Sequence, residues 1–323
     1  MTATLLSAAG TLADHGESAL IAAIVERFTT PQPLDVGIGD DGAVFRHPQP
    51  VVAVADAMME GVHFDRAWSP AATIGRKLVA VNVSDIAAMG GVPTYALFTA
   101  SLPKDLPWSW VLSLLDGVAA EATRVGMTVC GGDVTGSPGP VCLSLSVLGR
   151  LVSDKPLLRR SARVGQSVYV TGSLGGSALG LSVLQTGLPR AELVPSAIEA
   201  HRTPTPRLRE GAALSRWFGV GACMDLSDGL AQDASRLAAA SGVRLELDLD
   251  RLPPHPGLAL VSPDRATHFM LHGGEDYELL FTGDGPPPCH ATCIGEVVAG
   301  AGIGWLRSGK PVALTVDVGF SHF

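Results

Sequence analysis

The chain has 323 residues, of which 46% are hydrophobic and 17% charged, and its formal net charge is −8. This length supports roughly two ordinary domains, and the acidic balance without a basic cluster argues against nucleic acid as a partner. Glycine, proline or charge interrupts the apolar runs well before the ~20 residues that a membrane span needs. Residues 1–20 lack a basic leader and a long apolar core, so we expect a cytoplasmic protein.

Short apolar runs typical of strands alternate with longer helical patterns, which indicates a mixed α/β (α+β) architecture. In chain order, the first half is predicted to hold a strand at 50–58, a helix at 69–91, a strand at 95–102, a helix at 105–126 closed by Gly126, and strands at 127–136 and 140–151. A polar, basic connector follows at 153–166. We therefore expect two domains, 1–150 and 151–323, with the boundary near residue 150.

The second half repeats this alternation. In chain order, it is predicted to hold a strand at 167–172, a glycine-rich helix at 173–187, a helix around 204–219, a strand, turn and helix at 220–243 that stop at Gly242, and strands at 244–250, 277–282 and 293–298. The glycines of 170–180 superficially suggest a dinucleotide fingerprint, but the G-x-G-x-x-G spacing fails. We interpret them as close packing of a helix on a strand. Five cysteines without a C-x-x-C pair indicate reduced, buried thiols rather than zinc ligands.

Several aspartates stand beside glycine, alanine or serine without an evident cation. The set is Asp40, Asp41, Asp56, Asp85, Asp133, Asp225 and Asp228. Three of them, Asp56, Asp133 and Asp225, directly follow apolar runs, so we expect them at strand ends on one rim of a sheet, where α/β folds bind ligands. Any one alone has an ordinary explanation; Ser227 or Asp228, for example, could cap a helix that begins near Gly229.

Together these carboxylates favour several Mg²⁺ ions, which take oxygen ligands and usually keep substrate phosphates in their shell. Mg²⁺ on such carboxylates suggests phosphate chemistry. The usual nucleotide-binding signatures are missing, however, because the sequence has neither G-x-x-x-x-G-K-[ST] nor the protein-kinase H-R-D and D-F-G motifs.

Six motifs appear in order from Gly37 onward, within a resemblance that runs from about residue 17 to the C-terminus: GIGDDGAVF, AVADAMMEGVHF, KLVAVNVSDIAAMGGVP, CGGDVTG, MDLSDGLAQD and GGEDYELLFT. Together they resemble the thiamine-monophosphate kinase family, within the superfamily of aminoimidazole ribonucleotide synthetase and selenophosphate synthetase. The resemblance implies two α/β domains of that type, with the N-terminal domain forming a homodimer interface. It also implies Mg²⁺-dependent transfer of the γ-phosphoryl group of ATP to thiamine monophosphate, giving thiamine diphosphate and ADP.

The same resemblance implies roles for individual residues. It implies metal ligands at Asp41, Asp56, Asp85, Asp133, Asp225 and Asp228, ATP contacts at Gly132, Asp133, Arg160 and Ser227, and thiamine-phosphate contacts at His63, Glu275 and Phe320. One departure is that Val54 and Ala55 stand where many members carry Ser or Thr, so only their backbone carbonyls could serve the metals. We predict no essential general base, because the attacking phosphate oxygen is already ionised near neutral pH.

Several of these residues also have ordinary structural interpretations. His63 could be a capping or core histidine, Arg160 part of a solvated basic face, and Phe320 an anchor of the C-terminus. Another ATP-dependent enzyme of the superfamily is a rival, although selenide chemistry would want a reactive N-terminal cysteine and the first cysteine, Cys130, lies inside a predicted strand. A non-catalytic nucleotide- and metal-binding maturation scaffold is a rival of another class. The presence of His63 and Glu275 beside the carboxylates argues against it.

Overall fold

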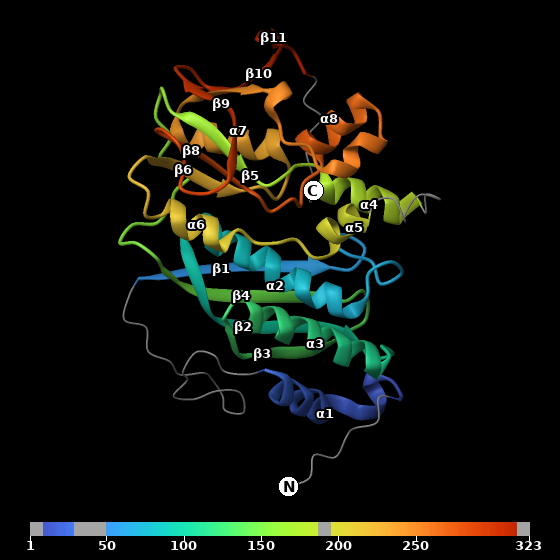
Figure 1. The fold of residues 1–323 in the computed structure, drawn as a ribbon. Coiled ribbons are helices and arrows are strands. Elements are labelled where there is room, and N and C mark those ends of the chain that lie inside the picture. Colours follow the sequence, from blue (N-terminus) through green and yellow to red (C-terminus); the bar gives the residue numbers. More distant parts are fainter. Residues whose placement is uncertain (1–8, 29–49, 187–194, 315–323) are drawn as a thin grey trace. The chain divides into compact units, whose positions relative to one another are not determined.

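The computed structural model describes residues 9–28, 50–186 and 195–314 (Figure 1). The chain divides into two compact units, one of Met1–Asn82 with Pro93–Arg150 and the other of Val83–Val92 with Leu151–Phe323. Both are mixed α/β, which confirms the predicted fold class. The domain limits and the roles assigned to 1–150 and 151–323 stay predictions.

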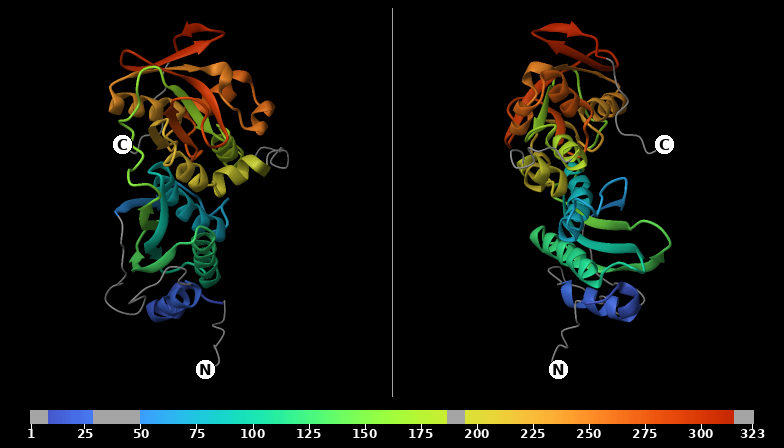
Figure 2. Two further views of the ribbon diagram at one scale, coloured as in Figure 1. Left: turned by 60° about the vertical axis from the view of Figure 1, so that its left-hand side comes forward. Right: turned by 90° about the vertical axis from the view of Figure 1, so that its right-hand side faces the viewer.

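The first unit is built on a four-stranded sheet. Its elements are α1 (Leu12–Arg27), β1 (Val51–Met59), α2 (Ala71–Ala88, shared with the second unit), β2 (Gly91–Pro103), α3 (Trp108–Arg124), β3 (Thr128–Ser137) and β4 (Cys142–Leu151). The strand order is β1-β4-β2-β3, so β1 and β3 are the outer strands among the described residues. Alternate residues of β4, Leu143, Leu145 and Val147, are fully buried. Helices α2 and α3 lie on that side of the sheet, and none of the described helices covers the opposite side, called the open face below (Figure 2).

Two glycines let α2 and α3 approach closely. A Cβ on Gly75 would lie 2.3 Å from the carbonyl oxygen of Leu114, and a Cβ on Gly117 would lie 2.1 Å from that of Ala72. Real Cβ atoms do not come this close to backbone oxygens, so neither position has room for a side chain. The two helices therefore touch backbone to backbone over the first sheet.

The second unit is built on a seven-stranded sheet of order β11-β10-β7-β9-β5-β8-β6. Its helices are α4 (Gly176–Thr186), α5 (Pro195–Arg202), α6 (Leu208–Leu214), α7 (Leu230–Ser241), η2 (Leu249–Arg251), η3 (Pro256–Leu260) and α8 (Pro263–His272). Its strands are β5 (Ser167–Thr171), β6 (Val220–Asp225), β7 (Arg244–Asp248), β8 (Leu279–Gly283), β9 (Ala291–Val298), β10 (Gly302–Arg307) and β11 (Lys310–Val312). Helix α7 stops at Gly242, as predicted, because that residue takes the left-handed conformation (φ 66°) typical of a helix C-terminus.

The glycine-rich stretch differs from its prediction in the element that it contacts. A Cβ on Gly180 of α4 would lie 2.1 Å from the carbonyl oxygen of Ala197 in α5, so the close packing is helix against helix rather than helix against strand. The cysteines agree better with expectation: all five are free, and Cys130 and Cys223 are buried. Burial raises the pKa of both thiols and keeps them protonated and unreactive.

Candidate functional site

Two of the three aspartates expected at strand ends lie inside their strands. Asp56 is paired with Leu145 in the middle of β1 and β4, and Asp133 is paired with Thr99 between β3 and β2. Leu145 is buried on the helix side of the sheet whereas Thr99 is exposed, so the two aspartates project from opposite faces. The shared rim was therefore wrong for this pair, because the apolar runs before them continue as strand. Asp225 is the last residue of β6, as predicted.

The surroundings of Asp56 combine a histidine, a buried amide and a buried lysine. The backbone N–H of Asp56 donates to Oδ1 of buried Asn82 (2.8 Å), which fixes the strand against α2. The surrounding protein desolvates the Asp56 carboxyl, although the residue reaches solvent, and raises its pKa, while His63 acts in the opposite direction. The N–H of Met59 donates to Nδ1 of His63 (3.1 Å), and Nζ of Lys77, which is only 3% exposed, donates to the His63 carbonyl (3.2 Å). Lys77 and Asn82 were not predicted, although both lie in a quoted motif.

In the second unit, the motifs MDLSDGL and GGEDYEL lie side by side. Leu226 donates its N–H to the carbonyl of Glu278 (2.9 Å), and the N–H groups of Tyr277 and Glu275 donate to the carbonyls of Leu226 (2.9 Å) and Ser227 (2.8 Å). Glu275 and Tyr277 take φ values of 56° and 51°, which are rare for residues with side chains. Such strain is typical of functional loops that their surroundings hold in place. Two predicted contact residues, Ser227 and Glu275, are thus brought together.

The end of β6 also meets the VNVSD motif. Asp225 is buried and accepts a hydrogen bond from Oγ of buried Ser84 (2.7 Å). Ser84 immediately precedes Asp85, which lies half-buried near the C-terminal end of α2. The residue before predicted ligand Asp85 thus contacts predicted ligand Asp225.

Asp228 has a cation close by, which the sequence analysis did not foresee. Arg236 of α7 forms an ion pair with Asp228 and also donates to Asp233 (2.9 Å). The fully buried Asp233 accepts from the N–H groups of Ser227 (3.1 Å) and Asp228 (3.0 Å). Burial raises the pKa of Asp233 to about 6. The helix cap is Gly229, without a side-chain hydrogen bond, so neither Ser227 nor Asp228 is the cap. The turn before α7 is held instead by Asp233, which lies within the helix.

Two further acids of GGEDYEL are structural anchors that sequence reasoning missed. Glu278 is buried and accepts from Nε of Arg207 (2.6 Å) and from Oγ1 of Thr171 (2.6 Å). Asp276 accepts from the N–H groups of Gly175 (2.8 Å) and Ser177 (3.3 Å) at the start of α4. Desolvation raises the pKa of Asp276 to about 7, although the two hydrogen bonds act to lower it. Repulsion by Glu278 and Glu275 raises it further. The two acids that follow Glu275 in the chain thus anchor its loop.

Asp276 predicts a pH dependence of stability. Its folded pKa of about 7 lies above the unfolded value of about 3.9, so its stabilising contribution is complete below about pH 4 and is lost as the pH rises through 7. The variant Asp276→Asn should therefore show a shallower fall in unfolding free energy between these pH values in urea titrations. Asp284→Asn is the control, because its side chain has a lowered pKa and titrates below this range. Equal slopes in wild type and Asp276→Asn would contradict the expectation.

The remaining predicted residues are placed as follows. Asp41 and Phe320, like Asp40, lie outside the described residues. Arg160 is exposed in the connector, and Val54 and Ala55 lie within β1. Gly132 lies where a Cβ would come within 1.7 Å of the carbonyl oxygen of Phe98, so β3 tolerates only glycine there. Within the described ranges, no three His, Cys, Asp or Glu side chains form a group able to hold a metal by themselves.

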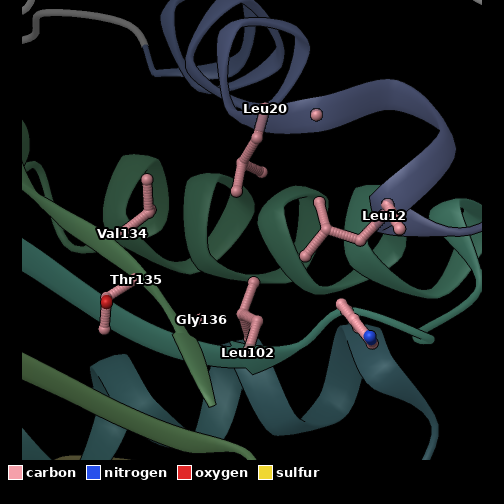
Figure 3. A pocket seen from close by; sticks show the side chains of 9 residues that line it. Leu12, Leu20, Leu102, Val134, Thr135 and Gly136 are labelled. Atoms are coloured by element: carbon pink, nitrogen blue, oxygen red, sulfur yellow. The ribbon is translucent and has the colours of Figure 1, made fainter. Parts of the chain in front are cut away.

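A pocket of about 310 Å³ in the first unit contains none of the predicted residues. Figure 3 shows Leu12 and Leu20 of α1 facing Leu102 of β2 across it. Its other lining residues are Ala13, Gly16, Lys104, Val134, Thr135 and Gly136. The lining is mainly apolar, which does not suit a site for two phosphorylated substrates.

The two α/β units are those of the AIR synthase-related class, which two family models match. Residues 39–151 match the N-terminal domain of AIR synthase related protein, and residues 163–284 match its C-terminal domain. The chain belongs to the thiamine-monophosphate kinase family of that class. It is 36% identical to thiamine-monophosphate kinase of Salmonella typhimurium, over 95% of this chain and 98% of that protein. It is 35% identical to that of Bacillus subtilis, over 81% and 82%.

Solved structures agree with this membership. Thiamine-monophosphate kinase from Stenotrophomonas maltophilia K279a matches with a TM-score of 0.77 and 32% identity, covering 91% of this chain and 96% of that one. AaThiL complexed with AMPPCP and TMP matches with a TM-score of 0.75 and 34% identity, covering 93% and 95%. The hydrogenase maturation protein HypE of E. coli has a TM-score of 0.79 at 19% identity, covering 94% and 98%, and shares the fold alone.

Proposed function

We propose that this chain phosphorylates thiamine monophosphate with ATP, giving thiamine diphosphate and ADP. The observation that carries the proposal is the pairing of MDLSDGL with GGEDYEL through three backbone hydrogen bonds. This pairing sets Ser227, the expected ATP contact, beside Glu275, the expected thiamine-phosphate contact. A relative at 34% identity has been solved with both AMPPCP and TMP, which supports the same pair of substrates here.

Mg²⁺ is proposed as the cofactor, and the donor chemistry fits it. Each unit would supply carboxylate oxygens, the donors that Mg²⁺ prefers, from its own residues: Asp85, Asp225 and Asp228 in the second unit, and Asp56 and Asp133, on opposite faces of the sheet, in the first. The desolvation that raises the pKa of Asp56 is a cost that a nearby cation offsets. When bound, Mg²⁺ would neutralise phosphate charge and support in-line transfer.

The residues of the chain have binding and orienting roles in this reaction. The bond between the γ-phosphorus and the bridging oxygen of ADP breaks, and a bond to an oxygen of the thiamine phosphate forms, with no proton to remove. Arg236 and Asp233 hold the amides of Ser227 and Asp228 in place. His63 accepts from the Met59 N–H through Nδ1, so its neutral ring presents an Nε2–H donor rather than a base.

The test is chromatographic detection of thiamine diphosphate after incubation with ATP, Mg²⁺ and thiamine monophosphate, with a chelator control. Metal-dependent product is the expected result. ADP without thiamine diphosphate would redirect the substrate to other members of the superfamily. If none of the candidate substrates is turned over, a non-catalytic maturation scaffold would be favoured. The likeness of this chain to the maturation protein HypE is one of fold alone.

A homodimer is proposed through the open face of the first sheet. Along β1 this face presents Val51, Ala53, Ala55, Ala57 and Met59, without a charge. Val51, Met59 and Leu97 are 46%, 42% and 44% exposed, although each is a large apolar side chain. Asp133 lies on the β3 part of the same face, so the apolar surface is that of β1 and β2, and such a surface is typical of a subunit interface.

The variant Leu97→Asp should therefore shift the chain from dimer to monomer in sedimentation or mass photometry, because a buried charge would face apolar residues. Leu260→Asp is the matched control, since Leu260 is 48% exposed in the second unit. A monomeric wild type, or a dimer that both variants retain, would count against this interface.

None of the helices in the described ranges is long and apolar enough to cross a membrane. The cytoplasmic location stays a prediction from the sequence.

A further inference from the structure

A buried histidine contacts the carboxylate of Glu275. His201 lies in α5, is 3% exposed, and its Nδ1 is 3.3 Å from Oε2 of Glu275 and 3.1 Å from Oγ of Ser177. Ser177 lies in the first turn of α4 and is buried. Neither His201 nor Ser177 was singled out by the sequence motifs, and the reaction described above uses neither.

The glycines of α4 bring His201 to this place. Helices α4 and α5 lie side by side (Figure 1), and Gly180 leaves no room for a Cβ against the carbonyl of Ala197. One turn earlier, a Cβ on Gly176 would lie 3.3 Å from the Cβ of Ala200, the residue before His201. A helix with side chains at both positions would hold α5 farther away and separate His201 from Ser177.

The geometry of Ser177, His201 and Glu275 excludes a nucleophile triad and favours an orienting contact. In a serine nucleophile triad, the serine and the acid contact opposite nitrogens of the ring, whereas here both contact Nδ1. A carboxylate can only accept, so a hydrogen bond between Nδ1 and Glu275 requires the ring proton on Nδ1. The pair is an orienting contact rather than a proton relay.

The Glu275 backbone makes this contact consequential. Its left-handed φ and its hydrogen bond to Ser227 fix where the side chain starts, and His201 determines where the carboxylate ends. The acids nearest to Glu275 in sequence, Asp276 and Glu278, are engaged elsewhere, with the α4 amides and with Arg207. Among the three acids of this loop, Glu275 is therefore the one whose carboxylate lies against His201.

We propose that His201 is a positioning residue that holds the Glu275 carboxylate for the thiamine half of the substrate, with Ser177 supporting the ring. This inference rests on the proposed function. The thiazolium ring of thiamine is a permanent cation, and an ionised, oriented carboxylate is its natural complement. A neutral donor such as Nδ1–H orients that carboxylate without neutralising it.

Three substitutions of His201 test the role. An asparagine places an N–H near the position of Nδ1, a glutamine places one near Nε2, and an alanine places none. His201→Ala and His201→Gln should raise KM for thiamine monophosphate about tenfold, as expected for losing a hydrogen bond to a charged group. KM for ATP and kcat should change less than about twofold on the same energy scale. His201→Asn should restore the low KM.

A substrate-free measurement keeps the test valid if the alanine variant unfolds. In ¹⁵N NMR of the full-length wild type, His201 should show the Nδ1–H tautomer, and Glu275→Gln should shift its ring resonances. A wild-type Nε2–H tautomer, or a ring signal that ignores Glu275→Gln, would overturn the contact. Unchanged KM in folded variants of an active enzyme would overturn the inference alone. A wild type that does not phosphorylate thiamine monophosphate would overturn the proposed function, and with it the substrate named here.

Discussion

Replacing Asp133 with asparagine should lower kcat/KM for thiamine monophosphate phosphorylation by at least about a hundredfold, the scale on which a single electrostatic contact acts in catalysis. Asp133 is exposed on the open face of β3, and no described residue forms an ion pair with it. Asparagine has nearly the same shape, so the change removes charge while the strand keeps its pairing with Thr99. Steady-state kinetics with varied Mg²⁺ should show a weaker metal dependence together with the loss of rate.

The matched control is Thr135→Ala, which alters an exposed side chain two residues farther along the same strand. This variant should keep wild-type rates, and both variants should keep the wild-type melting temperature. If folded Asp133→Asn turned over normally, Asp133 would have no part in binding metal or nucleotide.

Gly117→Ala should have the largest effect on stability. The added Cβ would lie 2.1 Å from the carbonyl oxygen of Ala72 and 2.8 Å from its Cα. Backbone cannot yield as a flexible side chain does, so α2 and α3 must separate, and we expect a loss of about 3 kcal/mol, at the upper end of overpacking. The better helix propensity of alanine, about 1 kcal/mol, offsets only part of this.

Urea unfolding followed by circular dichroism measures the effect. Gly139→Ala is the control, because nothing lies within 4 Å of the position that its Cβ would take and its backbone is compatible with alanine. It should unfold like the wild type. Equal midpoints for the two variants would mean that α2 and α3 can make room for a methyl group at Gly117 without loss of stability.

Apolar periodicity predicted the elements that have a buried face. The runs at 50–58 and 140–151 became β1 and β4, and the helix stop at Gly242 was found because the glycine ends an amphipathic pattern. Helices α1, α5 and α8 and strands β10 and β11 were not predicted. Helix α5 has only eight residues, two of them buried, and so offers little apolar pattern to read.

Several contacts of the candidate site could not be predicted from a single sequence. The motifs pointed to Ser227, Asp225 and Glu275. The alternation of buried and exposed residues along a strand can continue through an aspartate, however. The sequence pattern therefore could not show that Asp56 and Asp133 lie within strands and on opposite faces of the sheet. The ion pair of Asp228 with Arg236 spans a turn and two helical turns, beyond the spacing at which partners are sought on one helix. His201 reaches Glu275 only through the packing of α5, which depends on distant glycines.

The segment Val83–Val92 gives the chain an unusual order of assembly. It leaves the ribosome with the first unit, yet it belongs to the second. Ala88 packs with Leu157 and Leu214, and a Cβ on Gly211 would lie 2.1 Å from the carbonyl oxygen of Ala87. Its contacts are therefore synthesised tens to more than a hundred residues later. During translation this apolar segment therefore stays exposed until its packing partners have been synthesised. It is the part of the nascent chain where binding by a chaperone would be most useful.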